Sequence, residues 1–289
     1  MPLLNIFSSP HLCLKALSWP CRLIIRLLLR LIAFPGLSYL WGSISRMRNP
    51  RILVRWAIHC FVAHYRIDMH DHPGSPDDYP SLAAFFCRPL DPKKRLIGLV
   101  PDAVIAPADS ILTMAEVVHE DIATQVKGIT YRLSALIGEN LNFAAGYLTM
   151  TFYLSPRDYH RFHQPLDAEL VAAMRTGARL YPVNPFSTRS VANLFVDNER
   201  VILKMRTGNH YWYYIAVGAA FVGGILTTAG ELLEDDRWYF INRQVTQGKE
   251  IGRFEMGSTI ILLLPASLAG RVVAATGDVI RAGDTLSMR

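Results

Sequence analysis

At residues 254–260 the chain reads Phe254-Glu255-Met256-Gly257-Ser258-Thr259-Ile260, and the rest of the sequence is organised around this stretch. It follows a glycine-containing strand pattern at residues 247–253 and runs into an apolar segment at residues 260–265. The Gly-Ser pair fits a plain kink between two strands. It also fits a reactive site, because glycine leaves its carbonyl sterically open and the serine places a hydroxyl next to it. The stretch alone does not decide between these two interpretations.

Basic charge is concentrated at the N-terminus. The 289 residues carry a formal net charge of +6, and residues 1–67 hold nine of the 30 basic residues and none of the 24 acidic ones. These basic residues stand among Leu, Ile and Trp. Such a mixture suits an anionic membrane surface better than a nucleic acid, so we expect a membrane partner and no nucleic acid.

Two amphipathic helical patterns, residues 21–32 and 52–65, lie in this basic segment. The first repeats arginine at every fourth position: Arg22, Arg26 and Arg30. Each arginine near a bilayer centre would cost about 2.5–3.5 kcal/mol on insertion scales, so a spanning helix is disfavoured. We expect residues 1–66 to form a helical segment that lies on the membrane surface. The alternative is an ordinary helical pair packed on the body.

Residues 67–289 are expected to form a single β-dominated body. After a polar linker at residues 68–80, short β-type runs prevail, and residues 147–154 alternate as a buried strand does. Residues 247–252 and 276–286 both read as glycine-turn strand pairs, and the second resembles the hairpins of biotinyl and lipoyl carrier domains. The Met-Lys-Met of those carriers is absent. We expect an α+β fold with a barrel-like sandwich.

The segment after that strand, residues 155–165, carries two histidines. Ser155 suits an N-cap and Asp158 suits the capping-box position, so we expect one or two helical turns with His160 and His163 on neighbouring faces. A His-x-x-His spacing can also bind a metal. No third ligand stands in a matching context, and we expect no metal site.

Three separated residues could converge as a catalytic triad. Asp109 would orient an imidazole, His163 would take a proton, and the Ser258 hydroxyl would attack. Each residue also has an ordinary interpretation, since Asp109 could cap a turn, His163 could be a surface histidine, and Ser258 could sit in a kink.

The sequence resembles the membrane-associated phosphatidylserine decarboxylases of bacterial and mitochondrial type. The resemblance covers roughly residues 60–265 and rests on Phe-Phe-Cys-Arg-Pro-Leu at 85–90, Pro-Ala-Asp at 107–109, Tyr-Leu-Ser-Pro-Arg-Asp-Tyr-His-Arg-Phe-His at 153–163, and Gly-Arg-Phe-Glu-Met-Gly-Ser-Thr at 252–259. Two positions depart from the family pattern: Met256 stands where leucine is common, and Ser110 stands where glycine is common. Neither change removes a reacting group.

The resemblance implies a chain that makes its own cofactor. His163, oriented by Asp109, would deprotonate Ser258, whose oxygen would attack the Gly257 carbonyl. The products would be residues 1–257 and 258–289, with a covalent pyruvoyl group derived from Ser258. That group would form a Schiff base with the serine amine of phosphatidylserine and accept the electron pair released with CO₂, which yields phosphatidylethanolamine. His160 is expected to bind the lipid phosphate.

The same resemblance implies the partners and the location. The two chains would form a heterodimer, and two such heterodimers could pair as a homodimer. The protein would be held peripherally on the cytoplasmic face of the cell membrane. The spacing of Cys13, Cys21, Cys60 and Cys87 favours a reduced compartment, and no cleavable secretory signal stands out. Two rival functions remain: a membrane-surface serine hydrolase using Asp109, His163 and Ser258, and a non-catalytic lipid-binding protein.

Overall fold

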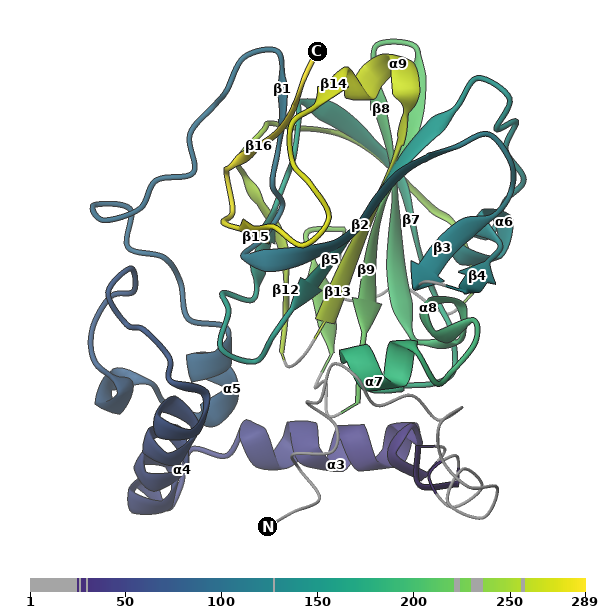
Figure 1. Cartoon of the computed structure of the whole chain (residues 1–289). Coiled ribbons are helices and arrows are strands. Elements are labelled where there is room, and N and C mark those ends of the chain that lie inside the picture. Colours follow the sequence, from purple (N-terminus) through teal and green to yellow (C-terminus); the bar gives the residue numbers. More distant parts are fainter. Residues whose placement is uncertain are drawn as a thin grey trace.

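Strands dominate the computed structural model (Figure 1), which describes residues 25, 27–29, 31–126, 128–220, 224–229, 236–255 and 258–289. The helices are α3 (Pro35–Ser45), α4 (Arg51–Tyr65), the 3₁₀ turn η2 (Pro76–Asp78), α5 (Leu82–Phe86), α6 (Leu133–Ile137), α7 (Pro185–Thr188), α8 (Leu194–Asp197) and α9 (Ala266–Ala269). The strands of the N-terminal half are β1 (Ala103–Ile105), β2 (Ser110–Val118), β3 (Ala123–Val126), β4 (Ile129–Tyr131), β5 (Tyr147–Leu154), β6 (Arg161–His163) and β7 (Ala168–Thr176). Those of the C-terminal half are β8 (Arg200–Thr207), β9 (His210–Gly218), β10 (Ile225–Thr227), β11 (Tyr239–Val245), β12 (Glu250–Phe254), β13 (Ser258–Pro265), β14 (Arg271–Val272), β15 (Val279–Ile280) and β16 (Thr285–Met288).

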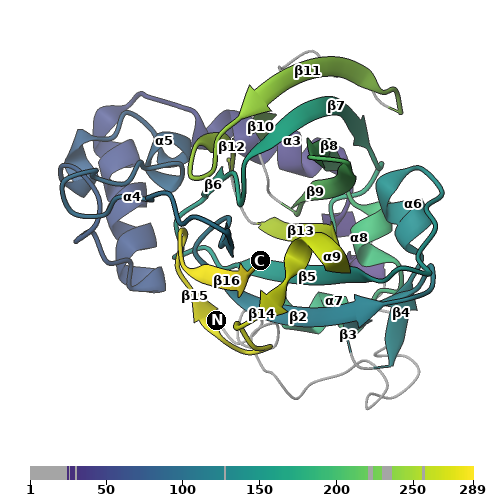
Figure 2. The same ribbon diagram turned by 90° about the horizontal axis from the view of Figure 1, so that it is seen from above.

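An eight-stranded antiparallel sheet with the order β11-β7-β8-β9-β13-β5-β2-β15 forms the body. Figure 2 shows it as a curved row of strands running from β2 to β11. Three smaller sheets, β10-β12-β6, β1-β16-β14 and β3-β4, complete the described strands. The expected α+β class is confirmed.

The expected barrel is not formed by the described strands. The large sheet ends at β11 and β15, which pair only with β7 and β2 respectively. After β11 the chain turns at Gly248, which has a φ of 78°, and β12 then pairs with β6 and β10 instead of closing the sheet. The likeness to carrier-domain hairpins is not confirmed, because β15 pairs with β2 and β16 pairs with β1 and β14.

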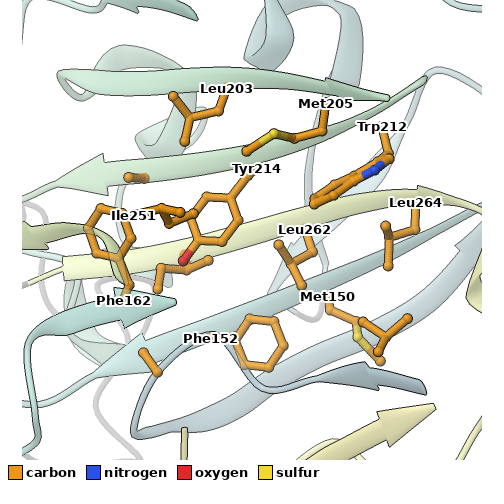
Figure 3. Packing of buried hydrophobic residues seen from close by; sticks show 14 of the residues in the cluster. Met150, Phe152, Phe162, Leu203, Met205, Trp212, Tyr214, Ile251, Leu262 and Leu264 are labelled. Carbon is orange, nitrogen blue, oxygen red and sulfur yellow. The ribbon is translucent and has the colours of Figure 1, made fainter. Parts of the chain in front are cut away.

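The core lies on both faces of β13, the central strand. Alternate side chains of a strand point to opposite faces, so Ile260, Leu262 and Leu264 join one buried cluster while Ile261 and Leu263 join another. Figure 3 shows the first cluster, whose large members are Phe152, Phe162, Trp212 and Tyr214. Burial of each such side chain contributes about 1.5–3 kcal/mol. The Gly257-Ser258 pair therefore leads directly into a strand in which every residue is buried.

The helices α3 and α4 lie beyond one end of the large sheet (Figure 1). α4 packs on α5 through a small cluster that includes Val54, Ile58 and Phe85. Its other side leaves Ile52 and Trp56 exposed. α4 ends at Tyr65. A domain boundary after residue 66 stays a prediction, and half of the first predicted helix, residues 21–32, lies outside the described residues.

Candidate active site

Ser258 begins the central strand of the large sheet. It lies opposite Leu154 of β5 and Gly218 of β9, and it is fully buried. Its hydroxyl has no hydrogen-bond partner in the described part of the chain. Buried polar groups are nearly always paired, so an unpaired serine hydroxyl at this position calls for an explanation. Gly257 and Met256 lie outside the described residues.

Backbone contacts hold the connection between β12 and β13. The Phe254 N–H donates to the His160 carbonyl at 3.0 Å, and the Phe254 carbonyl accepts from the Cys87 thiol at 3.2 Å. One residue later, the Glu255 N–H donates to the Gly224 carbonyl at 3.1 Å. The chain is thus anchored three residues before Ser258 and again at Ser258 itself.

His163 is the last residue of β6, and both of its ring nitrogens are engaged. The ring Nδ1 lies 2.9 Å from the Gly248 carbonyl and Nε2 lies 2.9 Å from the Tyr159 hydroxyl. Since a carbonyl oxygen only accepts, Nδ1 carries the proton and the Tyr159 hydroxyl donates to Nε2. Burial lowers the pKa of His163 from its usual value. The imidazole is therefore neutral near pH 7, with its lone pair at Nε2.

The Asp109 carboxylate is bound by Arg95. Arg95 donates to both carboxylate oxygens, with a distance of 2.8 Å between NH1 and Oδ2, and the Ala282 N–H donates to Oδ1 at 2.8 Å. Together these donors fix the orientation of the carboxylate. Arg95 lies on the loop after Asp91, fourteen positions before Asp109.

His160 is fully buried beneath the phenyl ring of Phe86, with 3.8 Å between the ring centroids. Its Nδ1 donates to the Asp158 carbonyl at 2.8 Å, and its Nε2 has no partner among the described residues. Burial, with the nearby charge of Arg88, lowers the pKa of His160 to about 3. In this form Nε2 offers a lone pair and not a proton.

The structure places the predicted residues on adjoining segments. The His163 N–H donates to the Pro107 carbonyl at 2.7 Å, which brings β6 beside the turn that carries Asp109. β6 also pairs with β12, the strand that leads to Ser258. Within the described residues, no hydrogen bond joins Asp109 to His163 or His163 to Ser258. The triad roles and the role of His160 stay predictions.

The expected helix at residues 155–165 is wrong. Ser155 and Asp158 do form the capping interactions, since the Ser155 N–H donates to Asp158 Oδ2 at 2.7 Å. They close a single turn, after which residues 161–163 extend as β6. The backbone of β6 finds partners in β12, and this pairing outweighs the local helical signal.

Two cavities adjoin these residues. One, of about 300 Å³, is lined by Asp109, Tyr159 and several charged side chains. The other, of about 390 Å³, is mostly apolar and is lined by Tyr153, Phe195 and Thr259, the residue after Ser258. Across the described ranges no group of three or more His, Cys, Asp or Glu side chains is placed to hold a metal ion.

Sequence reasoning missed Tyr159, Arg95 and Gly248 as partners of the predicted site. Tyr159 directly precedes His160 but carries no signal of its own, and Arg95 follows two lysines in what reads as a solvated basic loop. Gly248 contributes only its carbonyl, which sequence cannot reveal. The glycine at position 248 indicates a turn, but it does not indicate which side chain its carbonyl contacts.

Comparison with known proteins now decides the family. The phosphatidylserine decarboxylase family model matches residues 82–287. The phosphatidylserine decarboxylase proenzyme of Coxiella burnetii (strain RSA 331 / Henzerling II) is 36% identical over 226 residues, which cover 74% of this chain and 80% of that protein. The chain belongs to the phosphatidylserine decarboxylase family.

Two further relatives carry the same name. The proenzyme of Helicobacter pylori (strain Shi470) is 36% identical over 239 residues, covering 79% of this chain and 88% of that protein. The proenzyme of Variovorax paradoxus (strain S110) is 35% identical over 225 residues, covering 73% and 78%. The expected family and the expectation of an enzyme are both confirmed. Asp109, His160, His163 and Ser258 all lie inside the part of the chain that the decarboxylase family model matches.

Proposed function

We propose that this chain decarboxylates phosphatidylserine to phosphatidylethanolamine after cutting itself between Gly257 and Ser258. Family membership supports the reaction, and the name proenzyme, borne by its relatives, fits a chain that matures by cleavage. The single observation that carries the proposal is the fully buried Ser258, whose hydroxyl is unpaired and directly follows a glycine.

In the maturation step the Ser258 oxygen attacks the Gly257 carbonyl and converts the peptide bond to an ester. Elimination across the serine Cα–Cβ bond then releases the Gly257 carboxylate and leaves dehydroalanine. Hydrolysis of dehydroalanine consumes water, releases ammonia and leaves the pyruvoyl group at the start of residues 258–289. His163 would take the serine proton at Nε2, which carries no proton because Nδ1 is protonated, once the Tyr159 hydroxyl has released its hydrogen bond to that nitrogen. Asp109 would act as the third member of the triad, because its negative charge would stabilise the protonated imidazole of His163.

The described residues fit a pyruvoyl group at position 258. The position is fully buried, and no described side chain makes a hydrogen bond to its hydroxyl, so conversion of the serine breaks no such bond. When formed, the pyruvoyl group supplies an electron sink for the pair released with CO₂. Burial would exclude water from that group, and Tyr159 with His163 could carry the proton that replaces CO₂.

The two chains of the cut protein would stay together. All eight residues of β13 lie opposite β5, and six of them also lie opposite β9, so the short chain would remain the centre of the sheet. Its apolar side chains are buried on both faces. Separation would expose that core, which opposes dissociation.

The membrane surface is the proposed location, with the cytoplasmic face of the cell membrane as the side. Exposed apolar side chains and basic residues share α3, α4 and the loop between them, as interfacial helices require. None of the described helices is both long and apolar enough to cross a bilayer.

The test is the intact mass of the purified protein together with release of CO₂ from phosphatidylserine. We expect two chains, residues 1–257 and 258–289, with the shorter one blocked by a ketone that reacts with hydroxylamine. Ser258→Ala should leave one uncut, inactive chain. Ser287→Ala is the matched control, because Ser287 is also fully buried with an unpaired hydroxyl but follows leucine.

Further variants in the same experiment separate the roles. His163→Ala should remain uncut, Asp109→Asn should cut slowly, and His160→Ala should still cut. Cleavage of Ser258→Ala after Gly257 would refute self-cleavage by this serine. An uncut wild-type chain that reacts with an acyl-serine probe would instead establish a serine hydrolase.

A further inference from the structure

Arg88 is a buried cation without a counter-charge. Only 1% of its surface is exposed, and no carboxylate lies within ion-pair distance of it among the described residues. Its NH2 donates to the carbonyls of Arg157 and Asp158, at 2.8 and 3.3 Å. Its Nε and NH1 have no hydrogen-bond partner in the described structure. Buried charges in proteins are paired or solvated by ligands, so this one implies a missing anion.

Arg88 lines the cavity of about 300 Å³ that also contains Asp109 and Tyr159. The acidic side chains that face this cavity include Asp71, Asp109 and Asp158. Each has other partners: Asp71 pairs with Arg281, Asp109 with Arg95, and Asp158 accepts from the Ser155 N–H. The charge of Arg88 is therefore left for a ligand.

The position of this cavity links it to the proposed reaction. Tyr159 lines it and also donates to His163, and Asp109 presents its carboxylate to it. His160, whose pKa is lowered in part by Arg88, is near the same guanidinium. A substrate headgroup in this cavity would lie against Asp109 of the triad hypothesis and against Tyr159, the hydrogen-bond partner of His163.

We propose that Arg88 binds a phosphate oxygen in this cavity, and that the phosphodiester of the lipid headgroup supplies it. The assignment rests on the proposed function. A guanidinium N–H is a strong charge-assisted donor to a phosphate oxygen, and Nε and NH1 are the two nitrogens of Arg88 whose donors are unused. Neutral His160 cannot donate a hydrogen bond to the phosphate, because its free Nε2 carries no proton.

The headgroup carries a second anion, the serine carboxylate, which is a poorer candidate for this arginine. That group leaves as CO₂, and an arginine paired with it would stabilise the ground state and oppose the reaction. The phosphodiester keeps its charge throughout. Arg88 therefore anchors the part of the substrate that does not react.

The experiment uses the full chain with Ser258→Ala, which neither cuts nor turns over substrate. Binding of glycerophosphoethanolamine, inorganic phosphate and free serine is measured by calorimetry and ³¹P NMR. Arg88→Lys keeps the charge but removes the guanidinium and its Nε–H and NH1 donors, so we expect about a tenfold or greater loss of glycerophosphoethanolamine affinity. Arg157→Gln removes a charge from an exposed side chain of the same cavity and is the matched control, with a change of about threefold or less.

Four outcomes overturn the assignment, and a fifth bears on the proposed function alone. Unchanged affinity in Arg88→Lys would do so, and so would serine binding that depends on Arg88, which would make the carboxylate the anion. Phosphate binding without glycerophosphoethanolamine binding would leave a free-phosphate site. If Arg88→Lys does not fold, Arg66→Glu tests the same cavity from an exposed position, and unchanged affinity there would refute the proposal. Binding through Arg88 in a chain that releases no CO₂ would refute only the proposed function.

Discussion

Burial decides the charge state of the histidines at the level of single residues. His72, His160 and His163 all have lowered pKa values, and burial is the largest cause in each case. A neutral His163 suits a general base, which must begin without a proton on the acting nitrogen. The same burial has a consequence for stability, because unfolding returns each imidazole to water.

His160 makes that consequence measurable. Its pKa is about 3 in the folded chain and 6.5 when unfolded, so below pH 6.5 the unfolded chain binds a proton that the folded chain does not. The contribution of His160 to the free energy of unfolding is therefore fully present above pH 6.5. It decreases as the pH is lowered, by about 1.4 kcal/mol per pH unit between roughly pH 6 and pH 3. Urea unfolding of the Ser258→Ala chain at several pH values measures the slope.

His160→Asn should reduce the slope of the unfolding free energy against pH, because about one proton fewer is taken up on unfolding. His210→Asn is the control, since His210 is exposed and meets water in both states. Equal slopes in His160→Asn and the parent chain would mean that His160 takes up its proton in the folded state, contrary to its burial.

The ion pair between Arg46 and Glu255 is the feature to test at the level of elements. Arg46 is the C-cap of α3, and its Nε and NH2 donate to the carboxylate of Glu255, with 3.4 Å between Nε and Oε1. Glu255 stands two residues before Gly257. The pair thus ties a helix of the proposed membrane segment to the strand connection that is cut.

Arg46→Ala should slow self-cleavage several-fold in the absence of membranes, because the connection before Gly257 loses one of its anchors. A partly exposed ion pair contributes about 0.2–1 kcal/mol, which sets the size of the effect. Arg48→Ala, a nearby exposed arginine on the same loop, should cut at the wild-type rate. Reversal of the pair in Arg46→Glu with Glu255→Arg should restore the rate. If both single arginine variants behave alike, the pair does not position the cut.

Elements differ in how far their sequence predicts them. Residues 147–154 were predicted as a strand and form β5 with the same bounds, because their alternation matches a sheet with two buried faces. The segment carrying His163 was predicted as helix because its capping signals are local, whereas its pairing with β12 involves residues nearly ninety positions away.

The same limit applies to the site. Sequence motifs identified Asp109, His163 and Ser258 as candidates, and their segments do adjoin. The binding of Asp109 by Arg95 depends on the path of a loop, which carries no pattern. Arg88 belonged to a recognised motif, yet its burial was unpredictable because arginine is mostly exposed.

At the scale of the whole molecule, apolar exposure is unevenly distributed. Among the described residues, twelve of the 21 exposed large apolar side chains lie between Leu27 and Trp56. The same region is rich in arginine and holds no acidic residue. From residue 68 on, the chain has 24 acidic and 21 basic residues, so the N-terminal end of the molecule is both positively charged and apolar at its surface. That end is the proposed membrane-binding face.

Flotation with vesicles separates the apolar and the electrostatic contributions of this face to membrane binding. Trp56, 68% exposed, should insert its ring, and its loss in Trp56→Ala should weaken binding to neutral and anionic vesicles alike, by about 1–2 kcal/mol. Arg48→Gln should weaken binding to anionic vesicles alone, by about 1 kcal/mol. Phe240→Ala is the matched control, because Phe240 is 78% exposed but lies on β11 of the body. Equal losses in Trp56→Ala and Phe240→Ala would place the membrane contact elsewhere, since only a side chain inside the contact gains from leaving water.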